Sequence, residues 1–169
     1  MSETNEHLTN GHLTNEQLMG KHLSFVLGDG EYAVDILRIQ QVIQMQPITR
    51  IPRAPKFIRG VINLRGKVIP IINLHSKFNM EAVAETDKTC ILIADITNKK
   101  VALTVGIIID FVKDVTDITA EMLTDKPEAG TSKSARHIAG AVRMGEKVRF
   151  ILNLDEILAD EEFALLKTF

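Results

Sequence analysis

The strongest constraint on the fold is an internal duplication. Residues 60–74, with the sequence GVINLRGKVIPIINL, align without a gap on residues 140–154, with the sequence GAVRMGEKVRFILNL. The two copies share the opening glycine, a central Lys-Val pair and the closing Asn-Leu pair. In each copy two apolar runs flank a turn that contains glycine, which is typical of a β-hairpin. The duplication predicts one small β-unit built twice.

A fainter pairing precedes the two hairpins. Five mostly apolar positions of the first half align on five of the second: Ala33, Val34, Ile36, Ile39 and Val42 on Ala102, Leu103, Val105, Ile108 and Phe111. This alignment requires a longer connection in the second copy. Residues 124–137, which contain Pro127, Gly130 and a polar run, supply one.

Alternation of apolar and polar residues predicts further strands. Residues 23–27 and 32–36 alternate on either side of a Gly-Asp-Gly turn, as in a hairpin. A closing helix, capped by Asp155 or Asp160, is expected to run toward Leu166. Many short strands with frequent turns predict a mainly β chain with two small barrels rather than a parallel sheet.

The domain organisation follows from these elements. The polar N-terminus, in which the sequence His-Leu-Thr-Asn occurs twice, is expected to be a flexible tail over residues 1–21. The alternative is a short helix from Thr14 to Met19, in which Thr14 and Gln17 form a capping box. The ordered domain is expected over residues 22–167, with a first barrel at about 22–80, a second at about 88–154 and the helix at about 155–167.

Composition excludes several classes of protein. A hydrophobic fraction of 45% and a net charge of −2 are typical of a globular chain rather than a disordered one. No apolar run approaches the ~18 residues that span a bilayer, and the polar N-terminus is unlike a signal peptide. The single cysteine, Cys90, cannot form an internal disulfide, so a reducing, cytosolic setting is expected.

No motif assembles a reaction. Between Gly60 and Lys67 the glycine spacing is one residue too long for a phosphate loop, and Val68 replaces the hydroxyl residue that would hold magnesium. His75 and His137 lack metal-ligand partners and are expected at the surface or at a cap, whereas Cys90 is expected in the core. The sequence therefore predicts a protein without catalysis, metal or cofactor.

Charge is distributed unevenly. The segment between Asp35 and Glu81 contains no acid and eight bases: Arg38, Arg50, Arg53, Lys56, Arg59, Arg65, Lys67 and Lys77. We expect Lys67 and Lys77 to be solvated, while the loop cluster from Arg50 to Arg59 is equally consistent with solvation and with an acidic partner. A nucleic-acid-binding barrel is one alternative, although the chain has no Trp and one Tyr for base stacking. A small-molecule sensor would need a convergent polar pocket, for which the sequence gives no sign.

Three further motifs are GDGEYAVDI at residues 28–36, the Ile-Pro and PKFI pair at 51–58, and GVINLRGKVIP at 60–70. Together they resemble the CheW family of bacterial chemotaxis coupling proteins. The match continues through GIIID at 106–110 and ends at EEFALL at 161–166, so it covers about residues 22–167. The Asn-Leu-Arg-Gly hairpin is the most specific part.

The resemblance implies a fold, a function and partners. The family consists of two five-stranded SH3-like barrels packed together, without enzymatic activity. Its members bridge the cytoplasmic tips of methyl-accepting chemoreceptors to the CheW-like regulatory domain of the histidine kinase CheA. For this chain it implies an adaptor in the cytoplasm, at membrane-associated receptor arrays, without membrane insertion and without nucleic acid. A groove between the barrels would accept a receptor helix, and an exposed strand would meet the kinase domain.

The resemblance also implies site residues. The receptor-binding positions are Ile39, Gln41, Gly60, Arg65, Gly66, Gly106 and Val112. The kinase-binding positions lie on the strand that opens the second repeat: Cys90, Ile91 and Leu92. Ile39, Val112 and Ile91 could instead be core residues, and the two hairpin glycines could serve only backbone geometry. This chain departs from the family at Gln41, usually glutamate, at Asn73, commonly aspartate, and at Phe111, usually small; an exposed Phe111 would enlarge the apolar patch.

Overall fold

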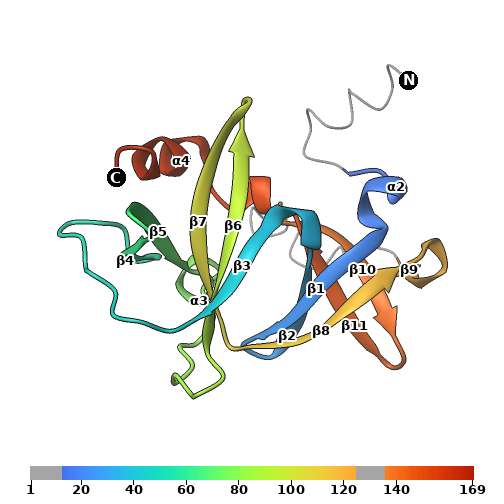
Figure 1. The fold of residues 1–169 in the computed structure, drawn as a ribbon. Coiled ribbons are helices and arrows are strands. Elements are labelled where there is room, and N and C mark those ends of the chain that lie inside the picture. The colour runs from blue at the N-terminus through green and yellow to red at the C-terminus, as the bar shows by residue number, and fades with distance from the viewer. Residues whose placement is uncertain (1–12, 125–135) are drawn as a thin grey trace.

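Two curled antiparallel sheets, each with one parallel pair of strands, form the body of the molecule (Figure 1). The computed structural model describes residues 13–124 and 136–169. Sheet A has the order β8-β1-β2-β11-β10-β9, and sheet B has the order β3-β6-β7-β5-β4. The strands of sheet A are β1 (Gly20–Leu27), β2 (Gly30–Asp35), β8 (Phe111–Ile118), β9 (Leu123–Thr124), β10 (Ile138–Met144) and β11 (Lys147–Leu152). Those of sheet B are β3 (Ile39–Gln44), β4 (Ile58–Leu64), β5 (Lys67–Asn73), β6 (Cys90–Asn98) and β7 (Val101–Ile109). The predicted mainly β architecture is confirmed.

Helices are short and lie at the ends of strands. The described residues form α2 (Asn15–Leu18), α3 (Leu74–Lys77) and α4 (Asp160–Leu166), together with the 3-10 turns η1 (Ile36–Arg38), η2 (Ala120–Met122) and η4 (Leu154–Glu156). The C-terminal helix is shorter than predicted, because η4 and an irregular stretch precede it. Neither Asp155 nor Asp160 caps α4. Its N-cap is Ala159, whose backbone N–H donates to Glu162 Oε1 at 2.7 Å.

Both hairpins of the duplication are present. Strands β4 and β5 turn at Arg65-Gly66, and strands β10 and β11 turn at Gly145-Glu146. Each hairpin carries a bulge one residue before its opening glycine, where the register shifts between Ile58 and Gly60 and between Ile138 and Gly140. The turn Arg65-Gly66 has positive φ at both residues, 55° and 86°, which is the two-residue turn that matches strand twist.

The two repeats exchange strands. Hairpin β1–β2 of the first repeat joins β8 to β11 of the second, while hairpin β6–β7 of the second repeat joins β3 to β5 of the first. Strand β11 pairs in parallel with β2, and β5 pairs in parallel with β7. The barrel boundaries predicted at about 22–80 and 88–154 therefore describe the repeats and not the sheets. Adjacency along the chain suggested those boundaries, but hydrogen bonding assigns the opening hairpin of each repeat to the opposite sheet.

The fainter sequence pairing was in the wrong register. Ala33 pairs with Ile151 and Gly106 pairs with Ile71, and these two isoleucines are equivalent in the duplicated hairpin. Ala33 therefore corresponds to Gly106 and not to Ala102. The cause is the greater length of the β6–β7 hairpin, whose strands of nine residues each are longer than those of β1–β2. The connection predicted at 124–137 falls mainly on residues outside the described part of the chain.

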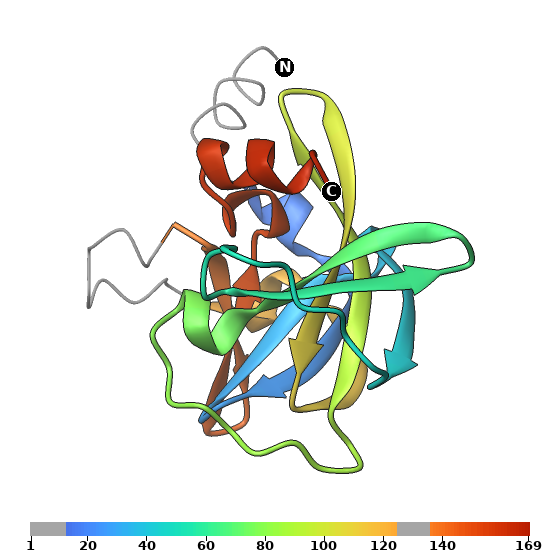
Figure 2. The ribbon, with the colours of Figure 1, turned by 90° about the vertical axis from the view of Figure 1, so that its left-hand side faces the viewer.

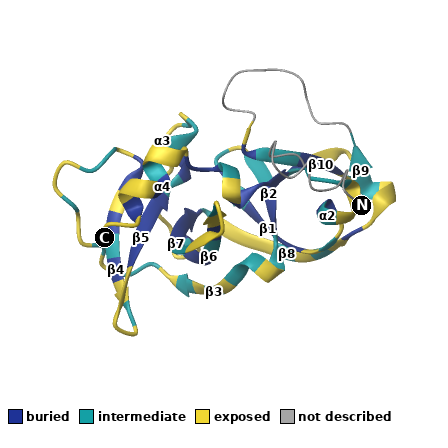
Figure 3. Cartoon of the chain, turned by 90° about the horizontal axis from the view of Figure 1, so that it is seen from above, coloured by how far each residue is buried: buried dark blue, intermediate teal, exposed yellow. Residues whose placement is uncertain are grey.

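Three apolar clusters account for the burial pattern in Figure 3. The largest, the central core, lies between the two sheets and α4 and includes Phe25, Leu92 and Phe163. Inner core B, on the opposite face of sheet B, is built of six buried isoleucines: Ile62, Ile69, Ile71, Ile91, Ile93 and Ile108. Inner core A, on the opposite face of sheet A, contains the buried residues Leu18, Ile118, Val142 and Ile151.

The segment just before β1 is ordered in residues 13–19, contrary to the prediction of a tail to residue 21. The alternative prediction of a helix is confirmed: the Thr14 hydroxyl accepts a hydrogen bond from Gln17 N, and the Gln17 side chain accepts one from Thr14 N. Leu18 is buried in inner core A and presses on Gly140, where a Cβ would lie 2.9 Å from Leu18 Cδ1. Residues 1–12 lie outside the described part of the chain.

Candidate protein-interaction surfaces

Strands β3 and β8 are equivalent edge strands of the two sheets. Strand β3 pairs with β6 as β8 pairs with β1, and each skips one residue at the same point, Gln40 in β3 and Lys113 in β8. This match makes Ile39 the counterpart of Val112. Two of the predicted receptor-binding residues thus occupy the same position in the two halves of the molecule.

These edge strands expose apolar side chains beside the central core. Val42 is paired with Leu92 and Val115 with Leu23, and residues paired across an antiparallel ladder point to the same face. Leu92 and Leu23 are buried in the central core, whereas Val42 is 42% and Val115 is 53% exposed. Both strands lie on the same side of the molecule (Figures 1 and 3).

Sequence reasoning found Ile39 and Val112 but missed Val42 and Val115. Val112 is 38% exposed, and Ile39 is half-buried against the central core. Phe111 is also exposed, so it does add to the apolar surface of β8. The period-two alternation could have indicated Val42 and Val115, because each lies on the same strand face as a core residue of its neighbour. We call Ile39, Val42, Val112 and Val115 the edge-strand surface.

Three further predicted receptor-binding residues have conformational roles. Gly60 is buried, with φ of +148°, and a Cβ there would lie 2.2 Å from Thr49 O. Gly106 is buried in β7, where a Cβ would meet Ile71 Cδ1 at 2.5 Å. Gly66 supplies the positive φ of its turn, and its N–H donates to Asn63 Oδ1. None of the three offers a side chain to a partner.

Gln41 and Arg65 are placed differently from each other. Gln41 is paired with Ile93 of inner core B and is half-buried. Arg65 is exposed at the tip of the β4–β5 hairpin, which extends away from the body of the molecule (Figure 2). Because a non-glycine residue at positive φ is strained, the arginine is not there for backbone geometry.

The predicted kinase-binding strand is corrected by the structure. Strand β6 lies between β3 and β7, so both of its edges are already hydrogen-bonded. Ile91 and Leu92 have no accessible surface, one facing inner core B and the other the central core. Only Cys90 is partly exposed, and burial raises the pKa of its thiol. The resemblance placed the kinase-binding residues on this strand, whose apolar run is the one expected of an interior strand buried on both faces.

Some basic residues of the acid-free segment are used inside the molecule. Arg38 pairs with Asp155 and donates to Asp95 O at 2.8 Å, and Arg59 pairs with Glu85 at 3.0 Å. Lys77 pairs with Glu162 and lies over the ring of Phe57, so the prediction that it is solvated was wrong. The side chains of Arg50, Arg53, Lys56 and Arg65 form no hydrogen bond or ion pair with other described residues.

Two histidines are buried rather than at the surface. His75 Nε2 lies 3.1 Å from Asp110 Oδ1, and Asp110 Oδ2 accepts a hydrogen bond from Gly28 N. His137 stacks on Phe78 with the ring centroids 3.8 Å apart. Burial, with a smaller contribution from the nearby Lys77, lowers the pKa of His137 to about 4. The histidines were predicted at the surface or at a cap, and the surface placement is wrong because both are buried. His75 lies in α3, whose N-cap is Asn73.

The described residues contain no group of side chains that could form a metal centre. Within 13–124 and 136–169, no three His, Cys, Asp or Glu side chains are grouped as a metal ion would require. In the same residues, no helix has the length and apolar character needed to cross a membrane. Asn73, where the family commonly has aspartate, is the N-cap of α3 at the end of β5: its Oδ1 accepts from His75 N at 3.0 Å.

Comparison with known proteins agrees with this arrangement. The model of the CheW-like domain matches residues 21–162. The chain is 35% identical to the chemotaxis protein CheW of Klebsiella aerogenes over 85% of this chain and 84% of that protein. It is 31% identical to CheW of Treponema pallidum, over 85% of each chain. The crystal structure of the scaffolding protein TtCheW from Thermoanaerobacter tengcongensis superposes with a TM-score of 0.73 at 30% identity, covering 83% of this chain and 88% of that one. The chain therefore belongs to the CheW-like family and is a coupling adaptor of bacterial chemotaxis.

Proposed function

We propose that this chain couples the cytoplasmic tips of methyl-accepting chemoreceptors to the histidine kinase CheA, without catalysing a reaction. The observation that carries the proposal is the family match over residues 21–162 in a molecule whose two edge strands expose valines beside the central core. In this proposal a receptor helix packs on the edge-strand surface, because an amphipathic helix buries its apolar face on such residues.

The second partner needs a separate surface. The regulatory domain of CheA would have to bind outside β6, since that strand is interior. Exposed cations support an electrostatic contribution to partner binding: Arg50, Arg53, Lys56 and Arg65 have no counter-ion among the described residues. Such charges raise the rate of association more than the final affinity. The adaptor would act at receptor arrays, where both partners are present.

A valine-to-aspartate substitution tests the receptor surface. Val115→Asp places a charge on the exposed face of β8, and we expect it to weaken binding of a receptor-tip fragment about tenfold or more. Val101→Asp is the matched control, because Val101 is 40% exposed on the β6–β7 hairpin, outside the edge-strand surface. Titration calorimetry with the fragment measures both. Equal affinities for the two variants would contradict the proposed surface.

A further inference from the structure

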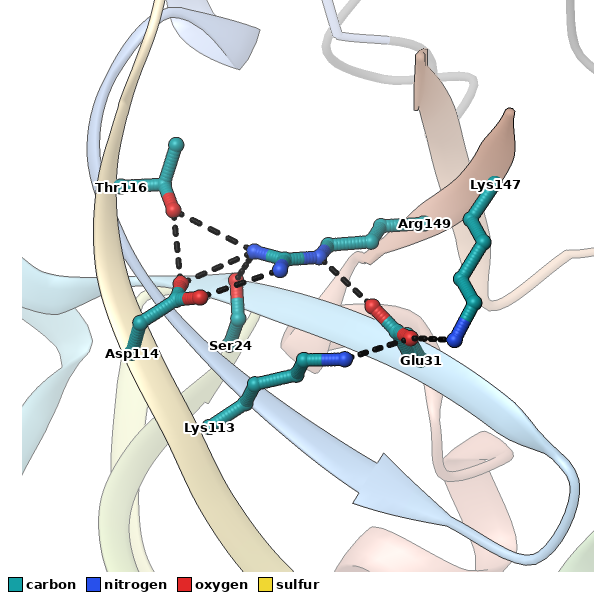
Figure 4. Close-up of polar contacts among 7 residues, drawn as sticks. All are labelled: Ser24, Glu31, Lys113, Asp114, Thr116, Lys147 and Arg149. Atoms are coloured by element: carbon teal, nitrogen blue, oxygen red, sulfur yellow. Dashed lines mark hydrogen bonds and ion pairs between the residues drawn. The ribbon is translucent and has the colours of Figure 1, made fainter. Parts of the chain in front are cut away.

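A buried arginine ties together four strands of sheet A. The guanidinium of Arg149 on β11 donates to Ser24 Oγ on β1 at 2.8 Å, to Glu31 Oε1 on β2 at 2.9 Å and to both carboxylate oxygens of Asp114 on β8 at 2.9 and 3.0 Å (Figure 4). Its side chain is only 7% exposed. Pairing with Asp114 raises the pKa of Arg149, and the arginine in turn lowers the pKa of the Asp114 carboxyl.

Sheet B has uncharged side chains at the equivalent positions, and the equivalents of Arg149 and Ser24 are the isoleucines Ile69 and Ile93. Arg149 is paired with Val142 as Ile69 is paired with Ile62, so Arg149 corresponds to Ile69. Asp114 is paired with Ser24 as Gln41 is paired with Ile93, so these pairs also correspond. Sheet B curls around its inner core without any buried charge at this place. The molecule itself shows that the fold does not require an arginine here.

Stability does not explain the arginine either. The side chains of Arg149 and Glu31 are 7% and 11% exposed, and replacing such a buried pair by apolar side chains is often neutral or stabilising. Asp114 is 42% exposed, and an ion pair with an exposed carboxylate contributes little to stability. Unlike Ile69, the arginine forms directional hydrogen bonds with its neighbour on the edge strand. Two parallel N–H···O bonds fix both the position and the orientation of Asp114, whereas packing between aliphatic side chains fixes orientation only loosely.

The strand held in this way is the edge strand β8. Asp114 lies directly after the residue that the β1–β8 ladder skips, Lys113, and Thr116 on the same strand face also accepts from Arg149, at 3.2 Å. Lys113 extends to Glu31 at 2.8 Å, so the bulged residue and the residue after it are tied to the same cluster. The opposite face of β8 carries Val115, next to Val112 across the bulge.

We propose that Arg149 is a positioning residue for receptor binding: it fixes the bulged conformation of β8 and thereby orients Val112 and Val115 toward the receptor. The inference rests on the proposed function of the edge-strand surface. Arg149 itself touches no partner, because it lies inside the curl of sheet A. Strand β3 needs no such device, since its inward residue Ile43 packs on inner core B.

The test transplants the residues of sheet B into sheet A. The double variant Arg149→Ile with Asp114→Gln copies Ile69 and Gln41 and leaves Glu31 paired with Lys113 and Lys147. We expect a folded protein with near wild-type melting temperature, faster amide exchange in residues 111–118 than in 39–44, and about tenfold weaker binding of a receptor-tip fragment. Arg136→Ile, which removes an exposed arginine just before β10 that pairs with Glu156, is the control and is expected to bind as the wild type does.

Each outcome decides between the proposals. Wild-type affinity in the folded double variant would overturn the positioning role, because a purely structural arginine would change the melting temperature and leave binding far below that temperature unchanged. If the double variant does not fold, Asp114→Asn, which keeps one acceptor and removes the second, replaces it; unchanged affinity would again overturn the role. Absence of binding by the wild-type chain would instead contradict the proposed function.

Discussion

At the residue scale, glycines that occupy matching positions can serve different purposes. Gly60 and Gly140 open the two duplicated hairpins and are equivalent in the sequence alignment of the repeats. In the structure Gly60 has φ of +148° and approaches the backbone of Thr49, while Gly140 has no such φ and makes room for the side chain of Leu18. The alignment predicted the positions of both glycines, but only packing shows why each is there.

The strained turn at Arg65 provides a binding test that does not destabilise the fold. Arg65→Gly removes the cation and relieves the positive φ, so we expect unfolding to become harder by about 0.5–1 kcal/mol while receptor-fragment binding weakens. Lys100→Gly is the matched control, because Lys100 also has positive φ, 69°, at the tip of the β6–β7 hairpin. Urea denaturation and fragment titration measure the two effects. If both variants bind equally, Arg65 is not part of the receptor surface.

At the scale of elements, the strands were predictable and their neighbours were not. Period-two alternation and the glycine turns located most strands, because each strand reports its own burial locally. The resemblance placed kinase-binding residues on the strand that begins at Cys90, yet this strand, β6, is an interior strand of sheet B. Pairing depends on which distant segment is adjacent, and neither the buried Arg149 cluster nor the parallel β2–β11 contact has a local signal in the sequence.

Helix α2 lies before the region that the family model covers, and its contact can be measured by a double-mutant cycle. Leu18→Ala should cost about 2–4 kcal/mol of unfolding free energy, since Leu18 is buried in inner core A. Gly140→Ala alone should cost about 1–3 kcal/mol, because its Cβ meets Leu18 Cδ1.

In the Leu18→Ala background the added methyl group has room, so Gly140→Ala should then be neutral or slightly stabilising. Denaturant midpoints of the four proteins give the coupling energy. Additive effects would show that α2 does not dock on Gly140. Gly60→Ala is a useful comparison, since the obstacle there is backbone and no side-chain truncation should rescue it.

At the scale of the whole molecule, the free energy of unfolding should decrease over two successive pH ranges as acid is added. The pKa of His137 is lowered from 6.5 to about 4, so the neutral ring is favoured in the folded state; its contribution to stability is complete above pH 6.5 and is lost as the pH falls toward 4. The pKa of Glu31 is lowered from 4.5 to about 2, chiefly by its hydrogen bond with Lys113. Its contribution is therefore complete above pH 4.5 and is lost as the pH falls toward 2.

Melting temperatures between pH 7 and pH 3 test this expectation. His137→Phe keeps an aromatic ring against Phe78 and cannot titrate. The variant should therefore lose about 1–2 kcal/mol less unfolding free energy between pH 6.5 and pH 4 than the wild type does. The decline below pH 4.5 should remain. An unchanged slope between pH 6.5 and 4 would mean that His137 does not govern the first stage.

The exchange of hairpins has a practical consequence. Each half of the chain holds strands whose hydrogen-bonding neighbours belong to the other half. Residues 81–88, between the halves, are exposed and carry no regular structure. A break there would leave two fragments with open ladders, neither able to complete a sheet alone. Each fragment would therefore depend on the other for its fold, and the two halves of this adaptor would have to be made together to be stable.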